Sequence, residues 1–406
     1  MKIGYPLEGI RVLALEQYIA GPDCTMWLAD SGAEVIKIER PGTGDPRRSY
    51  LPVVEDEKGN KAYGGFKIYN RNKKSMVLNL QSDRGKEIYK ELIRRTDIVV
   101  ENMAPNTVEK LGLGYDVLQK INPRLIYAAI SGFGRLEEFK GIYSERPAFD
   151  PVIQAMAGIM DQIGEENGPP SYGFPGLADA FVSVVTGYSI MLALYMREKT
   201  GEGQFIDSSM YDSLVALNTM GIMIYSFSGE IVTRGQILKY QAPAGTYMVK
   251  DGSYVALIVA NEFMWERFCK AIGREDLRED PRFVEGKKRV KNREVLETIV
   301  REWMGERTRD EVIEALLKGG VPVGPVQTTK DLVNCPHLEK RKMLLEIDDP
   351  IAGKRVFAKS PFRMTKVKEV PAVTAPDLGQ HTDGILRDLL KYDEKRIQEL
   401  RKEKVI

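Results

Sequence analysis

The stretch IRVLALEQYIAGPDCTMWLADSGAEVIKIE, residues 10–39, decides the fold class of this chain. It opens with the apolar run IRVLAL (10–15), which suits a buried strand, and closes with a second such run, EVIKIE (34–39). Between the two runs, a turn at AGP (20–22) precedes DCTMWLADS (23–31), which fits a short helix. Strand, helix and strand in this order predict a βαβ unit.

The same alternation continues through the first half of the chain. Apolar runs at 75–80, 97–102 and 125–131 predict strands, and amphipathic segments at 83–95 and 115–121 predict helices between them. Strands that alternate with helices form a parallel sheet with helices packed on it. We therefore predict an α/β fold of Rossmann-like type.

The pattern changes in the second half. Helices are predicted at 179–197 and 208–228, and then 245–259 resembles a hairpin that turns at Asp251-Gly252. The helical patterns that follow this hairpin predict a smaller second domain of about 80 residues, given usual domain sizes; they cover 262–272, 291–304 and 308–318. Two short helices, 382–391 and 393–403, are expected at the end of the chain.

Charge and cysteine usage exclude several classes of protein. The 406 residues include 59 basic and 58 acidic side chains, so the formal net charge is only +1. This balance argues against a nucleic-acid or membrane-surface binder. The three cysteines, Cys24, Cys269 and Cys335, are far apart and odd in number, which predicts neither a disulfide framework nor a zinc site and favours a reducing cytoplasm.

No membrane anchor or export signal is expected. The N-terminal residues MKIGYPLEG contain no apolar signal-peptide core. The most apolar segment, 181–196, is interrupted by small polar residues and is too short to span a bilayer, so we predict a helix buried in the protein.

The first βαβ unit does not carry a nicotinamide-binding motif. A dinucleotide site needs G-x-G-x-x-G between strand and helix, so that the pyrophosphate reaches backbone N–H groups. Here the turn contains only Gly21, and Pro22 lacks an N–H group. Only two histidines exist, His337 and His381, so catalytic triads and zinc sites are also unfavoured, and a structural role is expected for His381.

Basic residues recur near the ends of the predicted strands, where open α/β sheets bind ligands. As a group they suit a multiply phosphorylated ligand, although each one alone is more simply a solvated surface charge. They are Arg40, Arg47, Arg48, Arg71, Lys73, Lys74 and Lys110.

Asp179 is the strongest candidate for chemistry among the carboxylates. It follows a loop punctuated by glycine and proline and opens an apolar helix, where it is expected to cap the helix. The positive end of the helix dipole is expected to lower its pKa and keep it ionised. From these features alone, a capping role is the simpler interpretation and catalysis the less common one.

Several segments resemble the class III CoA-transferases, in order and over nearly the whole chain. The matching segments are 6–48, NRNKKSMVLNL (70–80), 99–134, RPAFDPVIQAMAG (146–158), 177–213, DPRF (280–283), GVPVGPV (320–326), SPFRM (360–364) and LGQHTD (378–383). The resemblance implies coenzyme A as a thioester substrate, with neither a metal nor a nicotinamide cofactor, and Asp179 as the catalytic nucleophile.

The resemblance also assigns binding residues. Arg40 falls where an arginine stacks on or near the CoA adenine, and Lys110 falls where a basic residue meets a CoA phosphate. Other positions fall on segments that line the CoA site, namely Leu78, Asn79, Asn102, Met103 and Ala104. Ile19 and Ala20 fall beside the thioester, and Phe149 and Asp150 fall near the acyl pocket.

The family's architecture implies a Rossmann-like large domain, built from N- and C-terminal parts, and a smaller α+β domain. Applied to this chain, the large domain would comprise 1–210 and a return segment 321–406, with a helical linker at 211–240 and the small domain at 241–320. Two such chains would interlock as a homodimer without nucleic acid or membrane. The implied reaction moves CoA from an acyl-CoA to a free carboxylic acid through anhydride and aspartyl-CoA intermediates.

Two other functions are compatible with the fold. An α-methylacyl-CoA racemase would need a histidine beside the aspartate, but the matching triplet here is Ala148-Phe149-Asp150, and phenylalanine cannot transfer protons. A CoA-binding protein without turnover is the second alternative. The residues Ile19 and Ser183, and the segment LIVANEFMW (257–265) without a glycine run, depart from the formyl-CoA:oxalate enzymes and predict a larger or less polar acyl group than theirs.

Overall fold

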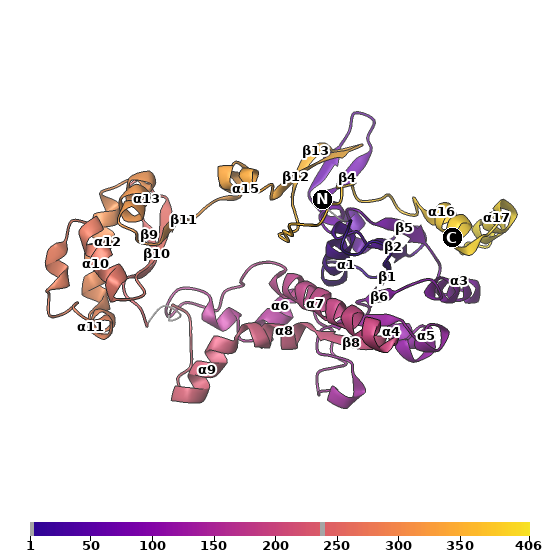
Figure 1. Ribbon diagram of the computed structural model, residues 1–406, viewed down its shortest axis with the longest axis horizontal. Coiled ribbons are helices and arrows are strands. Elements are labelled where there is room, and N and C mark those ends of the chain that lie inside the picture. The colour runs from indigo at the N-terminus through magenta and orange to yellow at the C-terminus, as the bar shows by residue number, and fades with distance from the viewer. Residues whose placement is uncertain (1–3, 236–239) are drawn as a thin grey trace. The chain divides into compact units, whose positions relative to one another are not determined.

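The computed structural model describes residues 4–235 and 240–406, so residues 1–3 and residues 236–239 of the predicted linker lie outside the described part. The chain forms two compact units, whose elements are labelled in Figure 1. Unit 1 comprises Met1–Met160, Tyr172–Met220 and Leu338–Ile406, and unit 2 comprises Asp161–Ser171 and Gly221–His337. Each unit encloses its own apolar core.

A six-stranded parallel sheet forms the centre of unit 1. Its strand order is β5-β2-β1-β6-β7-β8, and every neighbouring pair is parallel. The strands are β1 (Arg11–Leu15), β2 (Glu34–Glu39), β5 (Lys74–Val77), β6 (Ile98–Glu101), β7 (Ile126–Ser131) and β8 (Gln204–Ser209). The predicted α/β class with a parallel central sheet is therefore confirmed.

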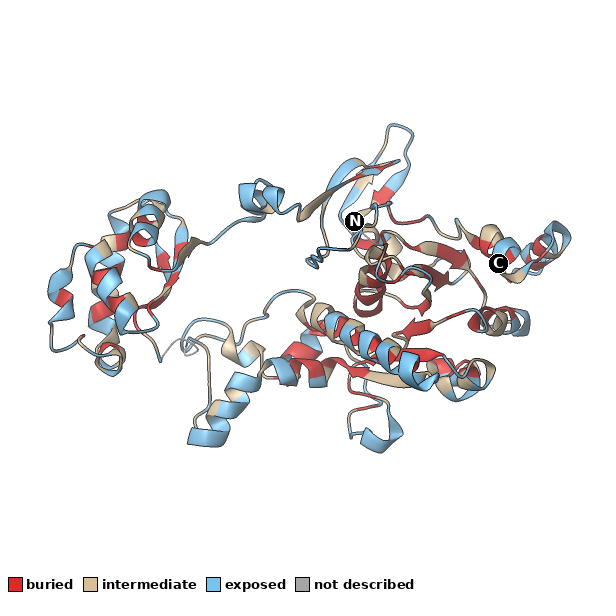
Figure 2. Cartoon of the chain, in the orientation of Figure 1, coloured by how far each residue is buried: buried red, intermediate tan, exposed pale blue. Residues whose placement is uncertain are grey.

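Helices cover both faces of this sheet, and the strands between them are buried (Figure 2). One face packs against α1 (Ala20–Asp30), α6 (Asp150–Met156), α7 (Leu177–Thr200) and α8 (Met210–Leu217). The other packs against α3 (Asp83–Ile93), α5 (Tyr115–Ile121), α16 (Thr382–Leu390) and α17 (Glu394–Lys402). The last two helices belong to the C-terminal segment, which thus completes the core that the N-terminal segment begins.

Two sequence-based expectations for local structure were wrong. Residues Ala20, Gly21 and Pro22 were predicted to form a turn, but they form the first turn of α1, where proline is tolerated because its missing N–H needs no partner. Residues 208–228 were predicted to be helical throughout, but Ser208 and Ser209 complete β8. The helix begins only at Met210, after the Ser209 hydroxyl accepts a hydrogen bond from the Asp212 N–H.

Helix α7 was expected to be buried all round, and this was also wrong. Its inner face packs on the sheet through Ala178, Val182, Ile190 and Ala193. The opposite face is exposed in the single chain, with Tyr188 65% accessible, and appears pale blue in Figure 2. The expectation that this segment is too short to span a bilayer was also wrong, because α7 has 24 residues. By length and composition alone it could cross a membrane, a property that it shares with core helices of soluble proteins.

Unit 2 combines a small antiparallel sheet with helices. The sheet has the order β11-β10-β9, and its strands are β9 (Ala244–Met248), β10 (Tyr254–Ile258) and β11 (Val323–Pro325). The predicted hairpin is thus present, and Gly252 takes the positive φ of 77° that its turn requires. The helices of this unit's core are α10 (Glu262–Ala271), α11 (Gly286–Lys291), α12 (Arg293–Gly305) and α13 (Arg309–Lys318).

Shorter elements complete the described chain. Two antiparallel hairpins pair β3 (Val53–Glu55) with β4 (Lys61–Tyr63), and β12 (Leu344–Asp349) with β13 (Gly353–Ala358). The remaining α-helices are α2 (Gly64–Lys67), α4 (Thr107–Lys110), α9 (Thr219–Ser228), α14 (Thr329–Val333) and α15 (Pro336–Lys340). Short 3-10 helices occur at Pro46–Ser49, Glu137–Phe139, Met160–Gln162 and Glu275–Arg278.

Candidate active site

Asp179 lies in the first turn of α7, inside the helix rather than at its cap. The helix begins at Leu177 because the chain turns there, with Gly176 in the left-handed conformation at φ 81°. The expected capping role of Asp179 was therefore wrong. Its side chain does not cap the helix and is partly buried at the edge of unit 1's core.

Asp150, the first residue of α6, satisfies the N-terminus of α7 instead. Its carboxylate accepts hydrogen bonds from the backbone N–H groups of Gly176 at 3.1 Å and Ala178 at 2.7 Å. The Gln154 amide donates to it at 2.9 Å, and the Tyr172 hydroxyl also donates to it. These four donors hold a buried carboxylate directly beneath the turn that carries Asp179.

The local environment raises the pKa of Asp179 to about 7. Burial is the main cause, and the negative charge of Asp150 adds to it. The positive charge of Arg47 lowers the pKa, and Asp23 raises it. The expectation that the helix dipole would keep the pKa low was therefore wrong, because loss of solvent and the neighbouring carboxylates outweigh a dipole effect that is modest per site.

A third carboxylate, Asp23 on α1, belongs to the same region. It accepts a hydrogen bond from the Trp27 indole N–H at 3.1 Å. Burial raises its pKa to about 6, although the Trp27 hydrogen bond and the charges of Lys73 and Arg71 act in the opposite direction. Sequence reasoning missed Asp23, because an acid in the first turn of a predicted helix is usually only a favourable end charge.

Ser183 joins α7 to α1 beside these carboxylates. Its hydroxyl lies 2.7 Å from both the Ala20 and the Asp179 carbonyl oxygens, so it donates to one of them at a time. Ile19 faces the same helix end, since a side-chain carbon added at Gly176 would lie 3.8 Å from Ile19 Cδ1. Ile19 and Ala20, predicted to lie beside the thioester, are thus next to the helix that carries Asp179.

Phe149 and Asp150, predicted to lie near the acyl pocket, are also at this helix end. Phe149 is 59% exposed, and its ring meets that of Tyr18 edge-on, with the centroids 5.5 Å apart. Asp150 is buried and engaged in the hydrogen bonds described above. The structure therefore brings the four predicted acyl-site positions together around the first turn of α7, while their roles stay predictions.

A cavity of about 410 Å³ opens at the carboxyl ends of β1, β2, β5 and β6. Four of the predicted CoA-binding residues line it, namely Arg40, Leu78, Asn79 and Met103. The strand order reverses between β1 and β6, and such switch points are where open α/β sheets bind ligands. Arg40 is exposed at the end of β2, so its charge is accessible to a ligand.

The other three predicted CoA-binding residues lie outside the lining of this cavity. The Asn102 side chain binds the backbone of Gln17 at both ends, accepting from its N–H at 2.9 Å and donating to its carbonyl at 2.7 Å. It thereby fixes the loop that leads from β1 to Tyr18 and Ile19. Ala104 and Lys110 are exposed.

Most of the basic residues that were grouped as phosphate ligands form ion pairs within the protein instead. Arg71 pairs with Asp30 at 2.6 Å, Lys73 with Glu16 at 2.8 Å, and Lys74 with Glu34 at 2.5 Å. The interpretation of that set as ligand-binding was wrong for these three side chains. Arg71 and Lys73 precede β5 and Lys74 is its first residue, so all three lie at the opposite end of the strand from Leu78. Their order in the sequence is enough to show this.

Arg48 also forms an internal ion pair, with Glu39 at 2.6 Å. His381, expected to be structural, accepts a hydrogen bond on Nδ1 from the Ser75 N–H at 3.3 Å, beside the start of α16. Within residues 4–235 and 240–406, no group of three or more His, Cys, Asp or Glu side chains has a geometry suited to a metal ion.

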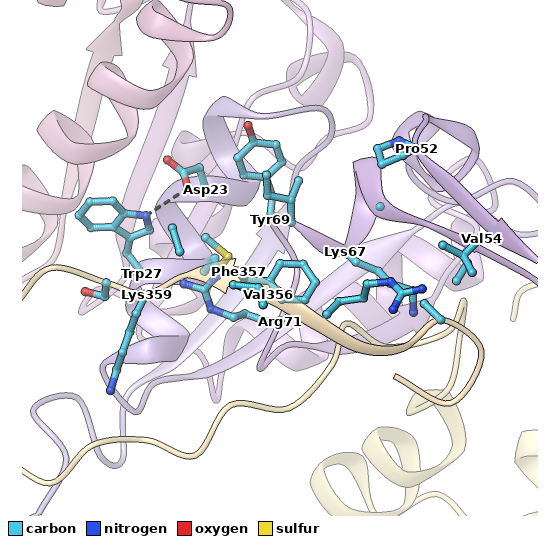
Figure 3. Close-up of a pocket in the computed structure, with 18 residues that line it drawn as sticks. Asp23, Trp27, Pro52, Val54, Lys67, Tyr69, Arg71, Val356, Phe357 and Lys359 are labelled. Carbon is cyan, nitrogen blue, oxygen red and sulfur yellow. Dashed lines mark hydrogen bonds between the residues drawn. The ribbon is translucent and has the colours of Figure 1, made fainter. Parts of the chain in front are cut away.

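A second cavity, of about 470 Å³, lies between α1, the β3–β4 hairpin, α2 and β13 (Figure 3). Asp23 and Tyr69 lie at one end of it, and its walls include Val356 and Phe357. The charge of Asp179 raises the pKa of Tyr69, after the larger effects of burial and Asp23. This end of the cavity therefore adjoins the carboxylates around Asp179.

Comparison with known proteins identifies relatives along most of the chain. A sequence model described as CoA-transferase family III matches residues 7–382. Succinyl-CoA:mesaconate CoA-transferase of Haloarcula marismortui is 40% identical over 383 residues, which cover 94% of this chain and 95% of that protein. Acetyl-CoA:oxalate CoA-transferase of Acetobacter aceti is 37% identical over 343 residues, which cover 84% and 86% of the two chains.

A solved structure is also similar over nearly its full length. The crystal structure of a CAIB/BAIF family protein from Brucella suis has a TM-score of 0.84 and 32% sequence identity. The match covers 95% of this chain and 99% of that one. The sequence match and the structural match thus both cover the part of the chain that contains Asp179.

Proposed function

This chain belongs to CoA-transferase family III, and on that premise we propose that it moves CoA from an acyl-CoA to a free carboxylic acid with Asp179 as the covalent nucleophile. The observation that carries this proposal is the position of Asp179. Its carboxylate lies in the first turn of α7 and does not cap the helix, because Asp150 accepts the hydrogen bonds of the helix N-terminus. The residues predicted to lie beside the thioester are at the same helix end.

The proposed reaction has four covalent steps. The Asp179 carboxylate attacks the donor thioester carbonyl and releases CoA thiolate, which leaves a mixed anhydride. The thiolate then attacks the Asp179 carbonyl, so the donor acid leaves and an aspartyl-CoA thioester remains. The acceptor carboxylate attacks this thioester to form a second anhydride and thiolate. Attack of the thiolate on the acceptor's carbonyl gives the new acyl-CoA and restores Asp179.

The raised pKa of Asp179 suits this sequence. A carboxylate with a pKa of about 7 is a stronger nucleophile than one at the usual value, yet a large fraction is ionised near neutral pH. The same surroundings that disfavour the charged carboxylate favour its neutral acyl forms, the anhydride and the thioester. Burial therefore favours the acylated form of Asp179 over its carboxylate, while the negative charge passes to the CoA thiolate or to the departing acid.

We place CoA at the carboxyl ends of the strands, in the cavity lined by Arg40, Leu78, Asn79 and Met103. Arg40 would meet the adenine, Lys110 a phosphate, and the backbone at Asn102 and Ala104 would flank the pantetheine chain. The Gln17 loop that Asn102 holds leads from this cavity to Ile19, which supports a continuous path toward Asp179.

The names of the relatives favour dicarboxylic acids as reactants, because mesaconate and oxalate each carry two carboxyl groups and succinyl-CoA is a thioester of the dicarboxylic acid succinate. We infer that this chain also uses a short dicarboxylic acid. The larger acyl group expected from the sequence agrees better with mesaconate than with oxalate.

We also propose the interlocked homodimer and a cytoplasmic location. The exposed apolar side chains on the outer face of α7 favour a second chain there, because single domains rarely leave such rows uncovered. Light scattering on the purified protein tests this state, and a monomeric mass would contradict it. The free cysteines Cys24, Cys269 and Cys335 support a reducing compartment.

A matrix of acyl-CoA donors and free acids, read by mass spectrometry, tests the proposed activity. We expect new acyl-CoA to form with at least one dicarboxylic acid, and we expect none with the Asp179→Asn variant. Lack of transfer with every pair would contradict a transferase. Deuterium uptake at the α-carbon of a branched acyl-CoA without an acceptor would instead favour the racemase, which Phe149 disfavours.

A further inference from the structure

Arg47 is held in a defined position near Asp179. It lies in the 3-10 helix Pro46–Ser49, and its backbone N–H donates to Asp45 at 2.9 Å. The guanidinium carbon lies 5.2 Å from the ring centre of Tyr50 and 5.1 Å from that of Tyr69. The Nε–H group donates to the carbonyl oxygen of Gly65 at 2.6 Å. The side chain is thus positioned by three separate contacts.

Gly65 is required for this arrangement. A side-chain carbon there would lie 2.6 Å from Tyr50 Cβ and 2.8 Å from the Tyr50 carbonyl oxygen, closer than any real contact. The backbone of α2 can therefore approach Tyr50 and receive the Arg47 hydrogen bond only because residue 65 has no side chain.

The two terminal nitrogens of Arg47 are not engaged. Within the part of the chain that the structure describes, neither forms a hydrogen bond or an ion pair with any side chain or carbonyl. A planar fork of N–H groups that is held in place and unoccupied matches the geometry of a carboxylate. Aromatic rings beside a guanidinium further restrict its movement.

A series of contacts connects this fork to the reacting carboxylate. Tyr50 meets Tyr18 edge-on at 6.4 Å between centroids, and Tyr18 meets Phe149 at 5.5 Å. Phe149 precedes Asp150, whose carboxylate binds the N–H of Ala178, the neighbour of Asp179. Arg47 influences Asp179 electrostatically but forms no ion pair with it, so their charged atoms lie farther apart than an ion-pair contact.

We propose that Arg47 binds the remote carboxylate of a dicarboxylic substrate while the other end of that substrate reacts at Asp179. This inference rests on the proposed function and assigns a specificity residue to it. A substrate with one carboxyl group would use Asp179 alone, whereas a substrate with two would bridge Asp179 and Arg47.

Charge gives a reason for such a residue. Asp23, Asp150 and Asp179 place three carboxyl groups in one region, and a dianionic acid would be repelled from it. A cation at the far end of the substrate compensates that repulsion, and arginine does so with two directed hydrogen bonds. The residues that line the proposed CoA cavity include Pro46 but not Arg47, so the Arg47 side chain is not part of that cavity.

Binding and kinetics of matched acids test this inference. Succinate and butyrate have the same carbon chain, but only succinate has a second carboxylate. For the Arg47→Met variant, we expect succinate to lose at least about tenfold more than butyrate, both in affinity by calorimetry and in kcat/KM, with the KM for acyl-CoA unchanged. Loss of the Arg47 charge also raises the pKa of Asp179, but that effect lowers kcat/KM equally for the two acids. Arg47→Lys should show a smaller loss with the same bias, and it carries the test if the methionine variant does not fold.

A matched control removes another stacked arginine. On α17, the guanidinium carbon of Arg396 lies 3.5 Å from the centre of the Tyr392 ring. Arg396→Met should leave the affinity and kcat/KM for both succinate and butyrate unchanged. An equal loss for succinate and butyrate, or no loss, would overturn the inference, and a selective rise in the KM for acyl-CoA would assign Arg47 to CoA instead. Absence of transfer by the unaltered enzyme would contradict the proposed function alone, because the calorimetric comparison does not depend on turnover.

Discussion

The carboxylate of Asp150 accepts a hydrogen bond of 2.7 Å from the backbone N–H of Ala178, which lies 28 positions later in the chain. This contact ties α6 to the first turn of α7 and does the work that a capping side chain within α7 would otherwise do. It also places a second carboxylate near Asp179, whose pKa it helps to raise. One side chain thus both builds the site and sets its electrostatics.

Removal of this contact should destabilise the protein. Asp150→Ala leaves the N–H groups of Gly176 and Ala178 without an acceptor, whereas the Gln154 amide keeps its hydrogen bond to the Phe174 carbonyl oxygen. Buried donors without partners cost about 1–3 kcal/mol each before relaxation, so we expect the free energy of unfolding to fall by about 2–4 kcal/mol. Urea denaturation followed by circular dichroism measures this change, and an unaltered midpoint would exclude the structural role of Asp150.

The rate of transfer should rise with pH through neutrality. The nucleophile is the ionised form of Asp179, whose pKa is about 7, so kcat/KM should fall about tenfold per unit on the acid side and reach a plateau on the alkaline side. A profile of kcat/KM between pH 5 and 9 checks this. A rate that is flat over that range would show that no carboxyl with a raised pKa limits the reaction.

Replacement of Asp23 should shift that profile. Asp23 raises the pKa of Asp179, so Asp23→Asn should move the midpoint to lower pH while the plateau rate changes less. Asp56→Asn, in the exposed turn between β3 and β4, is the matched control and should leave the midpoint in place. A midpoint that moves upward in the Asp23 variant would mean that its charge does not act on Asp179.

Replacement of Asp179 should stabilise the fold at neutral and alkaline pH. Its pKa is raised from 3.8 to about 7 in the folded protein, so the unfolded chain loses this proton first, and stability falls as the pH rises between these values. The Asp179→Asn variant has no charge to bury. The free energy of unfolding of this variant should therefore equal that of the unaltered protein at about pH 4 and exceed it by as much as ~4 kcal/mol at pH 8. Denaturation of both proteins at the two pH values measures it, and an equal difference at both would contradict the raised pKa.

Loss of the Arg40 charge should weaken binding of acyl-CoA more than binding of the acid. Arg40 lines the cavity at the switch point of the sheet, and one charge-assisted contact accounts for about tenfold in affinity. Arg40→Ala should therefore raise the KM for acyl-CoA about tenfold and leave that for the acid within about twofold. The control is Arg387→Ala on α16, an exposed arginine that pairs with Glu394. If only the KM for the acid increased, the CoA site would have to lie outside the cavity that Arg40 lines.

The sequence was sufficient to predict the sheet but not every helix boundary. Short apolar runs such as 10–15 and 34–39 predict buried strands, because a strand covered on both faces needs apolar residues throughout. The prediction of a turn at residues 20–22 depends on Gly21 and Pro22, which favour turns locally, yet packing of α1 against the sheet and α7 decides the outcome. Burial overrides local preference there.

The site was predicted less completely. Family resemblance was enough to select Asp179, and the structure brings Ile19, Ala20 and Phe149 to the same helix end. The raised pKa of Asp179 could not be predicted, because it arises from burial and from Asp150, whose contact with α7 is a tertiary one. The same holds for Arg47, which the sequence presents only as one basic residue among many.

The central claim is that Asp179 becomes covalently linked to CoA, and trapping of that intermediate tests it most directly. The enzyme is incubated with an acyl-CoA that it uses, without an acceptor acid, then quenched, digested and sequenced by mass spectrometry. We predict CoA on the peptide that contains Asp179, conversion to a hydroxamate at Asp179 by hydroxylamine, and neither product in Asp179→Asn. Transfer that continues in Asp179→Asn, or an adduct on Asp150 or Asp23 instead, would contradict the account.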